Sequence, residues 1–277
     1  MVKGGKQMKR KCTKILLAIL CLATLLVGCS KKEEAPKNEY VDGDFVKDMA
    51  KGLQARWDLS DKDEKKEGYE EIAVNSKENQ KMMLSYIDAE LNVIEKYTEE
   101  KFEDKKLQEI AVKYINLLKE HKEICPEITV DYDKYYEDFL PIYDERSKVI
   151  ETIVKDYGMT VDEKHQDTLD DFLTNSKMVA EQEQIEEEIQ KMVNNIQFQM
   201  VKDNGGGYKT YQAVVENTTG VDFQTFTVNI NLLNSEGVIV ETTYDQVSGF
   251  NKGAKVQFEF MTDKEFASTE VIVDWWE

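Results

Sequence analysis

The spacing of apolar residues along this chain changes near residue 200, and this change limits the folds that it can adopt. Before this point, apolar side chains recur every three or four residues, which is the period of an amphipathic helix. After it, apolar and polar side chains alternate, and Thr, Val, Asn and Gly become more frequent. We therefore expect an α+β protein in which an antiparallel α-helical bundle is followed by a small antiparallel β-sandwich.

Five helical patterns lie in the first part of the chain. Each has an apolar stripe that needs a partner, so residues 44–197 are predicted to form the bundle. Asn75 or Ser76 can cap the second helix, and Pro141 and Gly158 are expected to kink and to end the fourth. The stripes are Phe45, Met49, Leu53 and Trp57; Met83, Ile87, Leu91, Ile94 and Tyr97; Leu107, Ile110, Tyr114, Leu117 and His121; Tyr135, Phe139, Ile142, Arg146, Val149, Ile153 and Tyr157; and a longer pattern from Val161 to Asn195.

Short segments with the period of strands occupy residues 198–277. Turns rich in Asn and Gly separate them, and no helical pattern intervenes, which favours a sandwich. The parity of the alternation changes between Phe223 and Phe226. One extra residue is needed to change the parity, so we expect a β-bulge near Gln224 or Thr225.

The first 28 residues have the composition of an export signal. Six basic residues and no acidic residue come first, and residues 15–27 are almost entirely apolar. A helix of that length rises about 20 Å, whereas a membrane span needs roughly 17 to 25 apolar residues, so a retained transmembrane helix is the weaker interpretation. The chain could begin at Met1 or at Met8, because the basic segment after either residue is sufficient for an export signal.

The apolar run ends in Leu26, Val27, Gly28 and Cys29, which resembles the lipobox of bacterial lipoproteins. In that family, the cysteine thiol receives a diacylglyceryl group, and a peptidase cleaves the chain just before the cysteine. The resemblance implies that Cys29 is lipidated and holds the protein on the extracytoplasmic face of the cell membrane. The alternative is a secreted protein that the ordinary signal peptidase cleaves nearby. The polar residues 29–43 are interpreted as a flexible tether.

The chain is strongly acidic, with 55 Asp and Glu against 36 Lys and Arg and a net charge of −19. Cleavage before Cys29 removes six basic residues and no acidic one, which makes the mature charge −25. Nucleic-acid binding requires a basic surface that neutralises phosphates, so we expect no nucleic-acid partner. The charge fits a soluble surface protein, with a dedicated cation-binding role as the alternative.

Residues that commonly bind transition metals are scarce. After loss of the signal, Cys29 is acylated and Cys125 is the other cysteine, and the chain has only two histidines, His121 and His165. Structural zinc sites draw mainly on Cys and His. We therefore expect no metal and no cofactor apart from the diacylglyceryl group on Cys29, and we interpret Cys125 as a small buried apolar residue.

Part of the strand region resembles the FxLYD domain, a small β-sandwich found in lipoproteins of Gram-positive bacteria. Of the motif that names the family, Leu232 keeps the Leu, while Ile230 stands in the place of the Phe. Leu233 and Asn234 replace the Tyr and the Asp. The resemblance covers residues 198–277 and implies the fold and an envelope location, but no catalytic residue. The similarity lies in Asn217, the aliphatic alternation, residues 230–234, Gly237 and residues 238–242.

Two groups of aromatic residues are candidates for an interaction surface. Tyr132, Tyr135 and Tyr136 belong to a dense aromatic patch, which fits either packing against neighbouring helices or stacking on a sugar or peptide. Trp275 and Trp276 alternate in direction along a strand, so one is expected to pack inside and the other to be exposed. We take Trp276 as the candidate interface residue of this pair.

Together these features predict a non-enzymatic, membrane-anchored lipoprotein of the cell envelope that binds an envelope protein or a wall component. A receptor for a small solute or a cation is one alternative. The other is an envelope hydrolase that uses a pair of carboxylates, which requires neither His nor Cys. The sequence nominates no such pair.

Overall fold

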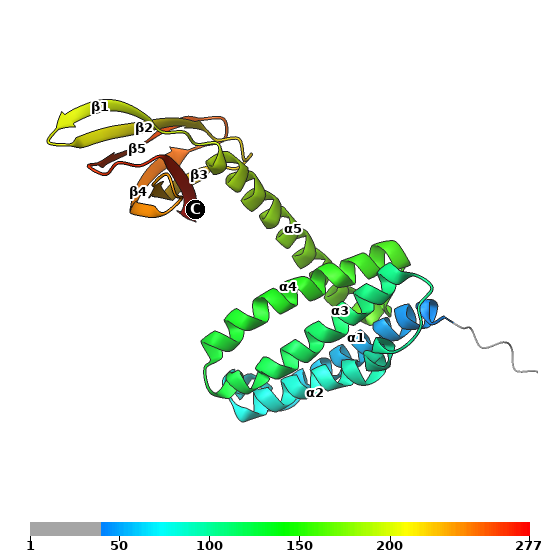
Figure 1. Ribbon diagram of the computed structural model, residues 1–277. Helices are drawn as coiled ribbons and strands as arrows, with labels where there is room; N and C mark the ends of the chain where they lie inside the picture. Colours follow the sequence, from blue (N-terminus) through cyan, green and yellow to red (C-terminus); the bar gives the residue numbers. More distant parts are fainter. Residues whose placement is uncertain (1–39) are drawn as a thin grey trace, which may run out of the picture. The chain divides into compact units, whose positions relative to one another are not determined.

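The computed structural model describes residues 40–277 (Figure 1). Cys29, the lipobox residues Leu26, Val27 and Gly28, and most of the predicted tether lie outside the described residues. Five helices are followed by six strands, as expected for the α+β class. In the described part, no helix is both long and apolar enough to cross a membrane.

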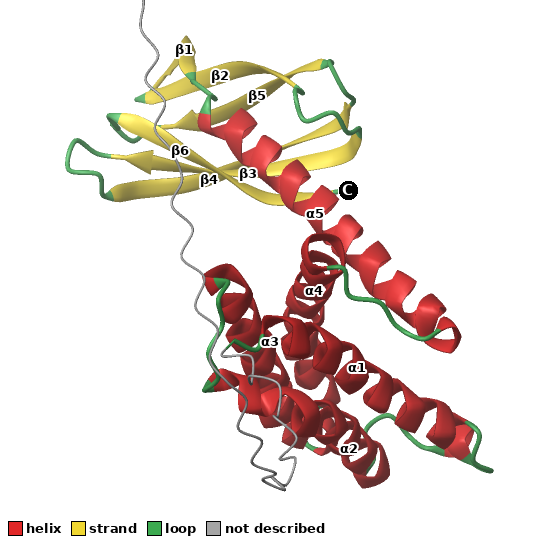
Figure 2. Cartoon of the chain, turned by 90° about the vertical axis from the view of Figure 1, so that its right-hand side faces the viewer, coloured by secondary structure: helices red, strands yellow, loops and turns green. Residues whose placement is uncertain are grey.

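The helical part is built around one apolar core (Figures 1 and 2). The first four helices lie side by side, and the apolar stripes predicted from the sequence supply most of the core side chains. Four short 3₁₀ turns connect the helices. The helices are α1 (Asp42–Glu64), α2 (Lys77–Ile94), α3 (Lys105–Ile124), α4 (Tyr132–Tyr157) and α5 (Gln166–Asn194), and the turns are η1 (Tyr69–Glu71), η2 (Glu95–Thr98), η3 (Cys125–Thr129) and η4 (Glu163–His165).

Local signals set the ends of these helices. The Ser76 hydroxyl accepts a hydrogen bond from the Asn79 amide at 3.1 Å, so Ser76 is the N-cap of α2. Gly158 ends α4 with a φ of 68°, a left-handed conformation that glycine adopts without the cost of a Cβ. Pro141 lies inside α4, and the helix continues beyond it to Tyr157. Gly52 lets α1 approach α2 closely, because a Cβ there would lie 3.2 Å from the Glu90 carbonyl oxygen.

Two three-stranded antiparallel sheets form the second part (Figure 2). One sheet has the order β1-β2-β5 and the other β4-β3-β6. Their inner faces meet in an aromatic core, in which Phe258 of β5 lies with its ring centroid 6.4 Å from that of Phe226 in β3. The strands are β1 (Gln199–Gly205), β2 (Tyr208–Glu216), β3 (Phe223–Leu233), β4 (Ile239–Phe250), β5 (Lys255–Thr262) and β6 (Ser268–Trp276).

The hydrogen bonds of Gln224 and Thr225 fit the predicted β-bulge on the side of β3 that faces β6, while the pairing with β4 is continuous across residues 223–226 and the register shift against β6 lies between Thr227 and Val228. The amides of Gln224 and Thr225 both donate to the carbonyl oxygen of Glu277, at 2.7 and 3.4 Å. Two residues of β3, Gln224 and Thr225, thus face the single residue Glu277, which is the arrangement of a bulge. As a result, Phe223 and Phe226 both point into the core, and each is fully buried.

The long helix α5 contributes to both cores, which differs from the predicted division at residue 197. Leu169 and Phe172 near its start belong to the core of the helical part. Ile189, Met192 and Val193 near its end belong to the core between the sheets. The last turns of α5 and the following Ile196 therefore pack with the strand region rather than with the bundle to which the sequence pattern had assigned them.

Candidate functional site

The predicted interaction residues do not form one surface. Tyr135 is 3% exposed, and its phenol oxygen lies 3.1 Å from His121 Nε2, so it belongs to the core. Tyr132 is half-buried against the same core, and Tyr136 is exposed. The patch therefore serves mainly to pack α4 against its neighbours, and of these three tyrosines only Tyr136 is exposed, at 49%.

The choice of Trp276 as the exposed tryptophan is wrong, and the strand register explains why. Trp276 pairs with Phe226, which faces the core, and its ring packs on Phe223 with centroids 5.5 Å apart. Trp275 pairs with Thr227 on the outer face and is 49% exposed. One tryptophan is packed and the other exposed, as expected, but their roles are exchanged.

A cluster of charged residues lies inside the helical part. The guanidinium of Arg146 in α4 donates to Glu90 in α2 at 3.0 Å and to the Tyr114 hydroxyl in α3 at 2.9 Å. Arg56 in α1 donates to the same Glu90 oxygen at 3.3 Å, and the Tyr114 hydroxyl donates to the other one. Glu90 and Tyr114 are fully buried, and Arg146 is 1% exposed. Four helices are therefore joined through one carboxylate.

The cluster holds two guanidinium groups and one carboxylate, so one positive charge is in excess. Arg146 Nε and the nearby His121 Nδ1 are the two buried side-chain atoms of residues 40–277 that have no hydrogen-bond partner. Burial, together with repulsion from Arg56 and Arg146, lowers the pKa of His121 to about 2. This histidine is therefore neutral at physiological pH and adds no further charge.

These buried groups are poorly suited to acid-base chemistry. Burial raises the pKa of the Tyr114 hydroxyl, which keeps its proton, and Glu90 is engaged by three donors. Cys125 is fully buried, its pKa is raised to about 11 by burial, and its thiol donates to the His121 carbonyl oxygen. The cluster therefore acts as a polar contact that fixes four helices against one another.

A second group of polar side chains can, by its geometry, hold a metal ion. Donor atoms of Asp58, Asp61 and His165 all lie within 4.8 Å of one another. His165 is 1% exposed, its ring lies 5.5 Å from that of Trp57, and its Nε2 is 3.0 Å from Asp58 Oδ1. The ammonium of Lys164 contacts the same Asp58 oxygen and so supplies a counter-charge to it. Because more than 100 residues separate His165 from the two aspartates, no local sequence pattern predicts this cluster.

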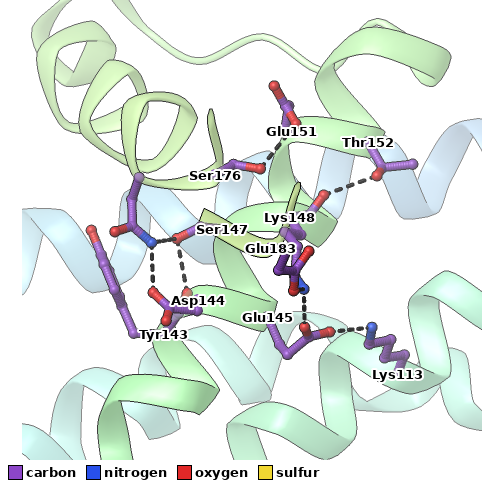
Figure 3. A network of polar contacts seen from close by, with 11 residues as sticks. Lys113, Tyr143, Asp144, Glu145, Ser147, Lys148, Glu151, Thr152, Ser176 and Glu183 are labelled. Atoms are coloured by element: carbon purple, nitrogen blue, oxygen red, sulfur yellow. Dashed lines mark hydrogen bonds and ion pairs between the residues drawn. The ribbon is translucent and has the colours of Figure 1, made fainter. Parts of the chain in front are cut away.

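Polar contacts on the surface join α3, α4 and α5 (Figure 3). Lys148 of α4 pairs with Glu183 of α5 at 2.8 Å, and Ser176 of α5 donates to Glu151 of α4 at 2.9 Å. Lys113 of α3 pairs with Glu145 of α4. The ion pairs among these contacts are largely exposed and contribute little stability individually. The contacts of Ser176 and Glu183 join α5 to α4, and that of Lys113 joins α3 to α4.

The outer face of the sheet β4-β3-β6 carries exposed apolar side chains. Tyr244 is 71% exposed, Trp275 49% and Ile272 44%. The Asn229 amide donates to Asp274 at 2.9 Å, and the Asn231 amide donates to Glu270 at 3.0 Å. Unlike the predicted aromatic patch on α4, this face presents aromatic and polar side chains to solvent together.

No protein-family model, curated protein or solved structure matches the chain. The similarity to the FxLYD domain stays a prediction that rests on the residues quoted for it.

Proposed function

We propose that this chain is a lipid-anchored protein of the cell envelope whose folded part binds a partner and catalyses no reaction. The observation that carries this proposal is the sequence Leu26-Val27-Gly28-Cys29 at the end of an apolar run with a basic start. An anchored protein needs a soluble part that presents a binding surface, and the exposed aromatic residues of the outer sheet face supply one. The buried cluster around Glu90 fits a structural role and supports the absence of chemistry at that position.

The lipid anchor is tested by labelling cells that express the full chain with an alkyne analogue of a fatty acid. The chain should acquire the label, partition with membranes and begin at Cys29 when analysed by mass spectrometry. Cys29→Ala should lose the label, whereas Cys125→Ala should keep it, because the thiol of Cys125 is buried. An unlabelled wild-type chain that begins at another residue would contradict the proposal.

The binding role is tested by proximity labelling, with the labelling enzyme fused after Glu277 and the Cys29→Ala chain as the unanchored control. We expect one envelope complex to be enriched in the wild type and to disappear in the control. A diffuse set of neighbours that is the same for both chains would count against a specific partner.

A receptor for a divalent cation is the second candidate, and the cluster of Asp58, Asp61 and His165 favours it. Two carboxylates and one imidazole are common ligands of such ions. The test measures the melting temperature of the full chain with Zn²⁺, Mn²⁺ or Ca²⁺, using Asp61→Asn and His165→Gln as variants and the exposed Asp170→Asn as the control. A rise in melting temperature that both cluster variants lose would support this function, and a rise that all three variants share would remove it.

A further inference from the structure

The outer face of the sheet β4-β3-β6 has an unusual distribution of charge. Its three strands contain no Lys or Arg, whereas β1, β2 and β5 of the other sheet each contain one Lys. The acidic residues Glu270 and Asp274 point to the outer face, and both are held by amide side chains rather than by cations. Their negative charge is therefore not neutralised by an ion pair within residues 40–277.

The strand register places two aromatic rings on either side of the central strand. Tyr244 of β4 pairs with Asn229, which in turn pairs with Ile272 of β6. In the next row on the same face, Trp275 of β6 pairs with Thr227. Because neighbouring strands are about 4.8 Å apart, the backbones of β4 and β6 are about 10 Å apart across β3. The short side chains of Thr227 and Asn229 form the floor between the two larger rings.

This arrangement matches the requirements of a cationic ligand. A Lys or Arg side chain over Asn229 would lie between the positions of Tyr244 and Trp275 and close to the Asp274 carboxylate. Aromatic faces attract cations, and the attraction adds to that of a nearby carboxylate. Exposed Trp and Tyr side chains are also the residue types that contribute most to binding energy at protein interfaces.

We propose that this acidic aromatic face binds a lysine- or arginine-containing segment of a partner protein. The inference rests on the proposed function, because it names the kind of partner that the anchored chain would bind. Charge complementarity selects this occupant: the face has carboxylates without basic residues, and the mature chain predicted from the lipobox carries a net charge of −25. An anionic polymer would meet like charge at the same place.

The test titrates the purified full-length protein in detergent with a hexa-arginine peptide, followed by calorimetry. A hexaglutamate peptide and a neutral N-acetylglucosamine oligomer are the comparison probes. The variants are Tyr244→Ala, Trp275→Ala and the double variant Glu270→Gln with Asp274→Asn. Because Tyr244 and Trp275 are exposed, their removal leaves the core intact, and circular dichroism should match that of the wild type.

A matched control removes the same charge elsewhere. Glu181→Gln with Glu187→Gln deletes two exposed carboxylates from α5 and leaves the sheet unchanged. We expect the affinity for hexa-arginine to fall at least about tenfold in each variant of the face and less than about twofold in the control, as for residues at the centre of an interface.

Three outcomes overturn the inference. If the control lowers the affinity as much as the face variants, the peptide is held by diffuse charge. If the sugar oligomer binds and Trp275→Ala abolishes that binding, the face is a glycan site. Absence of hexa-arginine binding also overturns it. The proposed function is tested separately by the fatty-acid label on Cys29, which these variants leave in place, so the two failures are distinguishable.

Discussion

Within the helical part, the excess positive charge around Glu90 makes this carboxylate the most sensitive member of the buried cluster. Glu90→Gln leaves two guanidinium groups buried without a counter-charge, and we expect it to lower the free energy of unfolding by about 3–5 kcal/mol. Arg146→Met should lower the free energy of unfolding by less than Glu90→Gln does, because Glu90 and Arg56 remain as a neutral pair. Urea denaturation of the three proteins at pH 7 measures this difference.

Glu120→Gln, at an exposed position of α3, is the control for loss of a carboxylate and should stay within about 0.5 kcal/mol of the wild type. Equal losses for Glu90→Gln and Arg146→Met would mean that the charge excess is relieved in some other way, for instance by a buried anion.

Asp48 gives the helical part a defined dependence on acid. Burial acts to raise its pKa, but hydrogen bonds from Lys51, Lys96 and Tyr97 lower it to about 2 from a usual value of 3.8. The folded state thus binds this proton less tightly than the unfolded state does. The resulting stabilisation is fully present above pH 3.8 and is lost as the pH falls toward 2.

We expect Asp48→Asn to lower the free energy of unfolding at pH 7 by about 1–2 kcal/mol, after allowance for the exposure of the two lysines. The difference from the wild type should shrink below pH 4 and disappear only as the pH falls through about 2, the pKa of Asp48 in the folded state. Thermal unfolding at a series of pH values, with the exposed Glu109→Gln as a control, measures it. A difference that is constant with pH would show that the carboxylate charge is not its source.

The sequence gives only a weak indication of the buried cluster around Glu90. Arg56 lies three residues after Leu53, and Glu90 lies three residues after Ile87, so both fall on apolar stripes, as Arg146 does. A charge on such a stripe indicates a buried partner, but the pattern does not say which charge on which helix it meets. No sequence pattern indicates that Asp58 and His165 lie close together, because contacts between distant segments depend on the tertiary fold.

At the scale of elements, local chemistry predicted the helix ends and the bulge. The Ser76 cap, the turn at Gly158 and the extra residue near Gln224 each depend on a few neighbouring residues, and the structure confirms all three. The path of α5 was not predictable in this way. Its apolar period continues throughout, and periodicity does not tell which core a given turn contacts.

The division of α5 predicts how the strand region behaves when it is isolated. A fragment of residues 183–277 keeps the apolar side chains of the last helical turns, whereas a fragment of residues 198–277, the domain suggested by the sequence, lacks them. Each such side chain contributes about 1.5–3 kcal/mol when fully buried. The longer fragment should unfold cooperatively, and the shorter one should bind a hydrophobic dye and lack a sharp transition. The side chains concerned are Ile189, Met192, Val193 and Ile196.

Glu187→Ala in the longer fragment is the control, because Glu187 is an exposed position on the same helical segment. It should leave the transition almost unchanged, while Met192→Ala should lower its midpoint clearly. If the shorter fragment is as stable as the longer one, the helix is not a necessary part of the core between the sheets.

For the whole molecule, the two cores share no side chain among residues 40–277, and α5 is the element that contributes to both. Residues 177–184 of this helix belong to neither core, and the contact described for this segment is the exposed ion pair of Glu183 with Lys148 of α4, which contributes little stability. A helical segment of this length is marginally stable without apolar packing. A substitution that destabilises one core should therefore have little effect on the stability of the other. The protein is expected to unfold in two steps rather than one.

This independence can be tested with one cavity variant in each core. Ile87→Ala and Phe258→Ala both remove fully buried side chains, and each should cost about 2–5 kcal/mol in its own core. Hydrogen exchange should then show lower protection of amides in α1–α4 only for the first variant and in β2–β6 only for the second. The double variant should show the sum of both effects, because additivity holds for sites without shared partners. Loss of protection throughout residues 40–277 in either single variant would instead mean that α5 couples the two cores into one cooperative unit.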